Sequence, residues 1–166
     1  VSEASKHFHN MAYRFLIAAD LWIFLTLTLA ILMSIPAINL YTHGTHITVA
    51  HTMGATIGIN SFLLLAIAFD LLHDTCRPIY VYTKWLNRSY WTANISLFIF
   101  WISLIAAGIL KARWQMSPSQ IPFSVMMLQI KPLFILFFLS GTVMAGGFFL
   151  ILYPFFKTDC CRVVAA

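Results

Sequence analysis

Four long apolar segments, separated by short polar stretches, limit the kinds of fold open to this chain. They cover about residues 12–35, 43–72, 90–110 and 132–156. A helix needs about 20 apolar residues to cross the hydrocarbon core of a bilayer, and each segment is long enough. The segments therefore predict an all-α integral membrane bundle of four transmembrane helices, in a single membrane domain that covers residues 1–166.

Composition agrees with a membrane protein. The chain is 61% hydrophobic and 9% charged, with a mean hydropathy of +0.86, whereas soluble domains carry about 25% charged residues. The net charge of +5 comes from basic residues in short loops, where they orient helices in the bilayer. It is therefore no sign of a nucleic-acid partner, and the expected partner of the surface is lipid.

The basic residues also predict the topology. The side that carries both termini has Lys6, Arg14, Arg77, Lys84, Arg88, Lys157 and Arg162. The other side has only Lys111, Arg113 and Lys131. Because cytoplasmic loops carry the excess of Lys and Arg, both termini are expected in the cytoplasm. On the opposite side, Pro118, Pro122 and Pro132 predict a loop from Gln115 to Lys131.

The start of the second segment gathers three histidines and a methionine, namely His43, His46, His51 and Met53. A histidine at membrane depth is costly unless it is paired or bound. On a helix, residues two apart point about 200° away from each other, so His51 and Met53 leave opposite sides and can serve two different rings. Imidazole and thioether groups are axial ligands of haem iron, so this pattern predicts a haem site.

Other functions are open to the same residues. His43 and His46 lie nearer the membrane surface and are placed to hydrogen-bond propionates or waters, although a lone membrane histidine such as His46 is often a polar bridge between helices. Met53 could simply pack in the core. The pair Gly54 and Gly58 allows close approach of either another helix or a flat ring.

One stretch resembles a known family. The run from Pro36 to His51 is similar to the segment that joins two late helices in the catalytic subunit of nitric oxide reductases, which belong to the haem-copper oxidase superfamily. The family has a Tyr-Thr-His-Gly-Thr run followed by Ala-His-Gly-His, and this chain has the first run at 41–45 and Ala-His-Thr-Met at 50–53. A weaker likeness to the last two helices continues at 91–94, 106–109 and 129–156.

The resemblance implies roles for the two ligand candidates. His51 matches the axial ligand of the high-spin, catalytic b-type haem, at which NO is reduced. Met53 stands where the family has the histidine of the low-spin haem. Either that haem is ligated by Met53 and a histidine of another chain, or it is absent. An oxygen-reducing terminal oxidase, or a non-catalytic haem-binding subunit, is the alternative function.

The resemblance also implies partners. The family binds its distal metal with three further histidines on earlier helices, and those helices are not in this chain. The chain is thus expected to be the C-terminal piece of a split catalytic subunit, or a fragment of one, and inactive alone. It would dock on a chain that supplies the N-terminal helices and the distal non-haem metal, next to an electron-donor subunit of the cytochrome c or quinol-linked type. The expected location is the bacterial inner membrane, with the histidine cluster towards the periplasm.

Asp20 lies inside the first segment. An intramembrane carboxylate is a functional candidate, because its charge is costly there. Reduction of NO or oxygen consumes protons, so Asp20 is a candidate for a proton path from the cytoplasmic side. The alternative is a hydrogen bond between helices near the interface.

Overall fold

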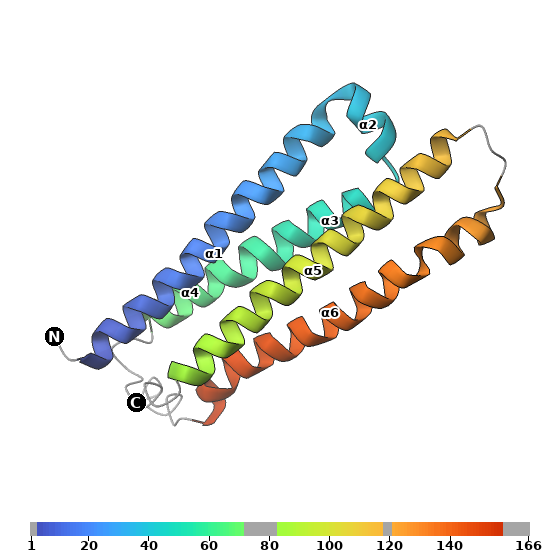
Figure 1. Cartoon of the computed structure of the whole chain (residues 1–166). Coiled ribbons are helices and arrows are strands. Elements are labelled where there is room, and N and C mark those ends of the chain that lie inside the picture. The colour runs from blue at the N-terminus through green and yellow to red at the C-terminus, as the bar shows by residue number, and fades with distance from the viewer. Residues whose placement is uncertain (1–2, 72–82, 118–120, 158–166) are drawn as a thin grey trace.

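The computed structural model of the chain describes residues 3–71, 83–117 and 121–157. Every regular element in this part is helical (Figure 1): α1 (Glu3–Ser34), α2 (Pro36–Thr42), α3 (His46–Met53), the π-helix η1 (Gly54–Ser61), α4 (Phe62–Leu71), α5 (Thr83–Met116) and α6 (Phe123–Lys157). The prediction of an all-α fold is confirmed.

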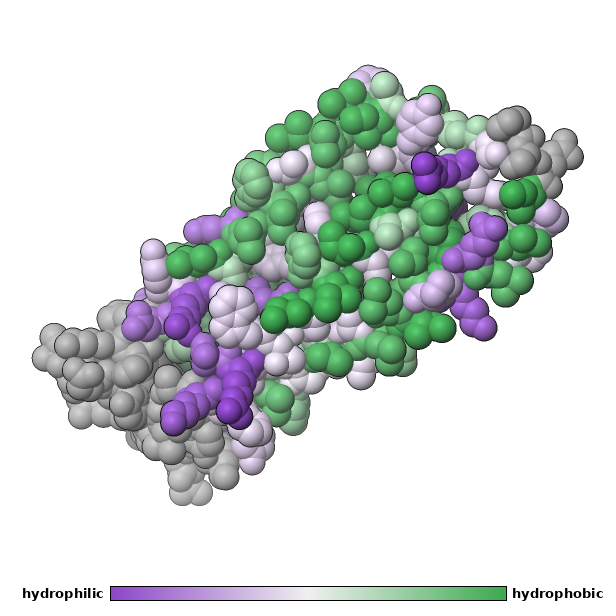
Figure 2. All heavy atoms as spheres, viewed as in Figure 1, coloured by the Kyte–Doolittle hydropathy of each residue, from purple (hydrophilic) through white to green (hydrophobic). Residues whose placement is uncertain are grey.

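Four stretches of these helices are long and apolar enough to span a membrane: Asn10–Ser34, His46–Leu71, Lys84–Met116 and Phe123–Phe156. The second span is made of α3, η1 and α4 in succession. Figure 2 shows the result on one face, where hydrophobic side chains cover the middle of the bundle and hydrophilic ones gather towards its ends. The chain is an integral membrane protein with four spans, as predicted.

The fourth helix begins earlier than predicted. The expected loop from Gln115 to Lys131 was wrong from Phe123 onward, although residues 118–120 lie outside the described residues. Pro122 lies just outside the helix, and its carbonyl accepts hydrogen bonds from the amides of Val125 and Met126. Pro132 lies inside the helix, where membrane proteins tolerate proline.

Packing explains why this first part of α6 is helical. Met126 and Ile130 are buried together with Ala107 of α5 in a small apolar cluster. That burial outweighs the hydrogen bond that Pro132 cannot donate. α5 is longer than the segment predicted over 90–110 for a related reason: its charged flanks, including Lys84 and Lys111, are tolerated at helix ends.

The connection between the first two spans follows from local chemistry. α1 ends at Ser34 because Ile35 precedes a proline and is extended, with φ −73° and ψ 121°, and Pro36 then starts α2. Gly44 has φ 70° and turns the chain, which non-glycine residues rarely allow. Thr45 caps α3, since its Oγ1 accepts from the amide of Ile47 at 3.3 Å.

Packing between the helices positions the second span. α1 packs on η1 and α4, α3 packs on α5, and α5 packs along α6 (Figure 1). The main apolar cluster joins α1, α4, α5 and α6 and contains a group of aromatic rings. In this aromatic cluster, Phe15 of α1 stacks on Phe62 and Phe69 of α4, and Tyr90 of α5 meets Phe15 edge-on. The second span is thus held between α1 and α5.

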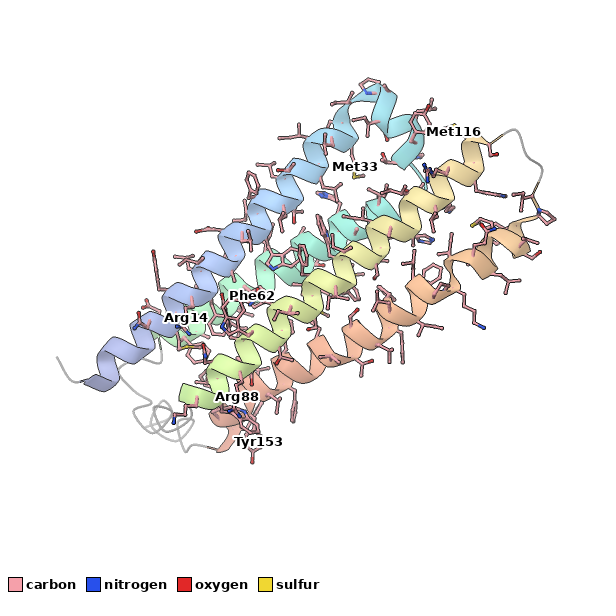
Figure 3. All side chains as sticks on the ribbon, viewed as in Figure 1. Arg14, Met33, Phe62, Arg88, Met116 and Tyr153 are labelled. Atoms are coloured by element: carbon pink, nitrogen blue, oxygen red, sulfur yellow. The ribbon has the colours of Figure 1, made fainter. Side chains whose placement is uncertain are left out.

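The start of α1 and the end of α6 lie at the same end of the bundle (Figure 1). Arg14, Arg88 and Tyr153 are at that end, and Met33 and Met116 at the other (Figure 3). Arg77 and Arg162, which entered the topology prediction, lie outside the described residues. The cytoplasmic location of this end stays a prediction.

Candidate functional site

His51 and Met53 both lie on α3, which is α-helical from His46 to Met53. The premise that residues two apart leave opposite sides of a helix therefore applies to this pair. α3 forms the part of the second span farthest from the chain termini (Figure 1). His43 precedes this helix and is the C-cap residue that follows α2.

His51 is half-buried, and its two ring nitrogens have different surroundings. Its Nδ1 is enclosed by protein and has no hydrogen-bond partner in the described part of the chain, whereas Nε2 is not enclosed. An imidazole with an open Nε2 fits an axial ligand of haem iron. A metal-bound histidine usually also donates its second ring N–H to a carbonyl, a carboxylate or water, and Nδ1 has no such acceptor among the described residues. The role of His51 as a ligand stays a prediction.

Met53 is half-buried and packs against the main apolar cluster, as Leu25 and Leu29 of α1 do. This is the surrounding of a packed core methionine. A thioether is also a suitable axial ligand, so the residue type fits a haem. The role of Met53 as a ligand stays a prediction.

His46 lies between helices. Its ring meets Phe134 of α6 edge-on, with ring centroids 5.0 Å apart. Its backbone lies against Gly108 of α5, where an added Cβ would be 3.2 Å from the His46 carbonyl carbon and 2.6 Å from the amide nitrogen of Ile47. The His46 ring thus lies between α3 and α6 and makes no hydrogen bond within the described part of the chain, so the polar bridge and the role at a propionate both stay predictions.

His43 is exposed at the end of the bundle. It lines a hollow of about 480 Å³ with Asn39 and Leu40 of α2 and with Gln115 and Met116 of α5. The loop beside it is fixed, because the Lys111 ammonium donates to the carbonyl of Gly44 at 2.7 Å. His43 is therefore exposed, on a segment tied to α5, and its role at a propionate stays a prediction.

The glycine pair serves helix packing. A Cβ on Gly54 would lie 2.8 Å from Thr26 Oγ1 and 3.1 Å from Trp101 Nε1. A Cβ on Gly58 would lie 2.6 Å from the ring of Trp22. Of the two explanations, another helix or a flat ring, the structure supports the helices: α1 and α5 occupy these faces.

Sequence reasoning missed two features next to the ligand candidates. One is the π-helix, which begins directly after Met53. Such segments are rare in proteins, and those that occur often lie at functional sites. The other is a set of buried polar atoms without partners, Trp22 Nε1, Thr26 Oγ1 and Trp101 Nε1. The four-residue spacing of Trp22 and Thr26 could have indicated one polar face of α1, but their meeting with Trp101 depends on the fold.

Asp20 is exposed on α1, between the buried Ala19 and Trp22. In the described part of the chain, it has no hydrogen-bond or ion-pair partner. The predicted alternative, a hydrogen bond between helices, is therefore not formed within residues 3–71, 83–117 and 121–157. A carboxylate on this outer face needs water or a partner outside the chain.

The described residues contain no group of three or more His, Cys, Asp or Glu side chains able to hold a metal ion. A family model, described as cytochrome c and quinol oxidase polypeptide I, matches residues 2–143. No curated protein and no solved structure gives a significant match. The matched range includes all five candidate site residues, Asp20, His43, His46, His51 and Met53.

Proposed function

Because the chain belongs to the family of cytochrome c and quinol oxidase polypeptide I, which is subunit I of the haem-copper oxidases, we propose that it supplies His51 as the axial ligand of a high-spin haem for NO reduction. Its family makes it part of a membrane-bound oxidoreductase that binds haem. Beyond this family membership, the proposal names His51 as the ligand, a high-spin haem as the site of reaction and NO as the substrate.

The observation that carries the proposal is the state of His51. Nε2 of this half-buried ring is not enclosed by the described residues, so it is the nitrogen through which His51 would bind iron. When bound, a haem of the b type supplies an iron that reacts with small gases. The chain itself fixes the imidazole on α3, and the packing of α3 on α5 limits how far it can move.

The substrate rests on the run from Tyr41 to Thr45 and on Ala50-His51, which resemble the nitric oxide reductases. A second candidate function, reduction of oxygen, is favoured by the family match itself, since the description of that family names oxidases. A haem-binding subunit without turnover is the third. Measurement of NO and oxygen consumption by the purified complex separates all three.

Met53 is proposed as the axial ligand of a low-spin haem, with a histidine from another chain on the opposite side of that haem. The alternative is that this haem is absent and Met53 only packs. His43 is proposed as a group near the haem propionates, because it is exposed next to the tied loop at Gly44. His46 is the weaker candidate for that role, since its ring already packs on Phe134.

The proposed partners are a chain that carries the missing N-terminal helices and the distal non-haem metal, and an electron donor of the cytochrome c or quinol-linked type. The first span supports this, because only 28% of its window is buried within the chain. We place the complex in the bacterial inner membrane, with α3 towards the periplasm and Asp20 on a proton path from the cytoplasm.

The test replaces His51 with alanine in the purified complex, with all co-purifying chains retained. His51→Ala is expected to abolish the carbon monoxide difference spectrum and all turnover, because the iron loses its ligand. His43→Ala removes a histidine proposed to lie near the haem propionates, and it should have a milder effect, altering the reduction potential or the haem retention in part. If His51→Ala binds carbon monoxide as the wild type does, the haem is held elsewhere and the proposal fails.

A further inference from the structure

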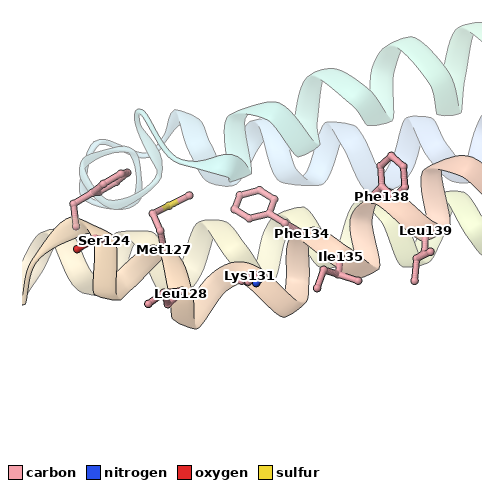
Figure 4. A pocket seen from close by; sticks show the side chains of 9 residues that line it. Ser124, Met127, Leu128, Lys131, Phe134, Ile135, Phe138 and Leu139 are labelled. Atoms are coloured by element: carbon pink, nitrogen blue, oxygen red, sulfur yellow. The ribbon is translucent and has the colours of Figure 1, made fainter.

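The exposed side of α6 has a groove beside the proposed haem site (Figure 4), and Phe134, which contacts His46, also lines it. Its volume is about 780 Å³. The residues that line it include Ser124, Lys131, Phe134, Ile135, Phe138 and Leu139. All of them come from α6, so the groove follows one face of a single helix.

The lining of the groove is almost entirely apolar, and Phe123, Met127 and Leu128 lie in the same stretch as Ser124 and Lys131. Lys131 is the one charged residue that lines it. In the described part of the chain, Lys131 has neither an ion-pair nor a hydrogen-bond partner. Further along the helix, Phe138 is 69% exposed and Leu139 is 55% exposed. The groove thus combines one positive charge with a long apolar surface.

The dimensions match a lipid leaflet. From Lys131 to Leu139 the helix rises about 12 Å, and one leaflet contributes about 15 Å of hydrocarbon. From Lys131 to Lys157 the rise is about 39 Å, close to the 40–45 Å of a bilayer that includes its headgroup regions. Lys131 therefore lies at the depth of the lipid phosphates, at the end of the bundle opposite the chain termini.

Aromatic residues beside the groove agree with this depth. The Trp114 ring meets Phe123 edge-on at 5.8 Å, and its indole N–H donates to the carbonyl of Ile121 at 2.9 Å. Aromatic residues gather where headgroups meet hydrocarbon, with an apolar ring and a polar handle. The part of the groove nearest Phe123 is thus at the headgroup level.

We propose that this groove binds an anionic phospholipid. The phosphate pairs with the Lys131 ammonium, the headgroup extends towards the Ser124 hydroxyl, and an acyl chain lies along Phe134, Ile135, Phe138 and Leu139. The charge decides between occupants: a transmembrane helix packed on this face would bury Lys131 without a counter-charge, which is costly. An anionic lipid brings the counter-charge with it.

The experiment exchanges the purified complex into micelles with equal amounts of phosphatidylglycerol and phosphatidylethanolamine, and then counts the retained lipids by mass spectrometry. The wild type is expected to retain phosphatidylglycerol in preference. Lys131→Gln should lower that retention about fivefold, the effect expected for one lysine at a membrane surface. Lys131→Arg should keep it. Lys84→Gln, which removes an exposed lysine from α5 at the other end, is the matched control and should also keep it.

A photoreactive residue in place of Leu139 identifies the occupant directly. Cross-linking to phosphatidylglycerol in the same complex supports the proposal. A cross-link to a polypeptide overturns it in favour of a protein partner. Equal retention of phosphatidylglycerol by Lys131→Gln and the wild type, with both complexes eluting as one species of the same size, also overturns it.

Discussion

The proposed low-spin haem depends on the thioether of Met53. It packs against the main apolar cluster, and replacement by leucine nearly conserves its volume, so packing alone should cost less than about 1.5 kcal/mol. If the sulfur binds iron, Met53→Leu removes the low-spin electron paramagnetic resonance signal of the complex. Met53→His should keep that haem but lower its reduction potential in a redox titration. An unchanged low-spin signal in Met53→Leu would leave Met53 with packing only.

Asp20 is the residue on which the proton path depends. It is exposed on α1 and has no partner in the described part of the chain, so replacing it should disturb little structure. Asp20→Asn keeps the size but loses the titratable group, and turnover of the purified complex should slow several-fold with an unchanged haem spectrum. Asp20→Glu, which keeps a carboxylate, is the control and should recover most of the rate. Full turnover in Asp20→Asn would end the proton-path proposal.

At the level of elements, the contact of η1 with α1 depends on Gly58. A Cβ there would lie 2.6 Å from the ring of the buried Trp22, so the helices must separate. Gly58→Ala should therefore destabilise the complex by about 1–3 kcal/mol, as overpacking does. Thermal unfolding measures the effect. Gly146→Ala is the matched control, because an added Cβ at Gly146 meets nothing within 4 Å. Equal melting temperatures for the two variants would contradict this packing.

The helices themselves could be predicted from hydropathy, because a span of apolar residues leaves few other structures in a membrane. Their ends could not. Pro132 indicated a loop, yet the burial of Met126 and Ile130 against α5 extends the helix to Phe123. The π-helix left no periodic signal, since every residue around it is apolar or small. The meeting of Trp22, Thr26 and Trp101 depends on contacts between distant segments, which one sequence does not encode locally.

The candidate site could be predicted in part. The position of His51 and Met53 on one α-helix followed from the pattern of apolar residues, and the surface position of His43 followed from its distance to the span. The packing of His46 on Phe134 could not be foreseen, because it joins α3 to α6. The enclosure of His51 Nδ1 likewise depends on how neighbouring helices pack around α3.

For the whole molecule, the topology prediction concerns which side of the membrane holds the ends. Arg14 and Arg88 lie at the end where α1 begins, and Lys111 lies at the other. A reporter that works only in the cytoplasm should be active when it is fused after Ala166, because the terminal side carries most of the basic residues. The same reporter fused after Ser117 in a truncated chain is the control and should be inactive, because that end is expected in the periplasm. The reverse pattern would move α3 to the cytoplasmic side.

The π-helix also sets the angular phase of the second span. In an unbroken α-helix, Phe62 would lie within about 20° of His51, so both side chains would enter the same side of the bundle. Phe62 is fully buried in the aromatic cluster with Phe15, while His51 keeps one ring nitrogen unenclosed. The i→i+5 bonds of η1 give wider turns, which sweep less angle per residue. One continuous span can thus bury phenylalanines at one end and leave the Nε2 of His51 open at the other.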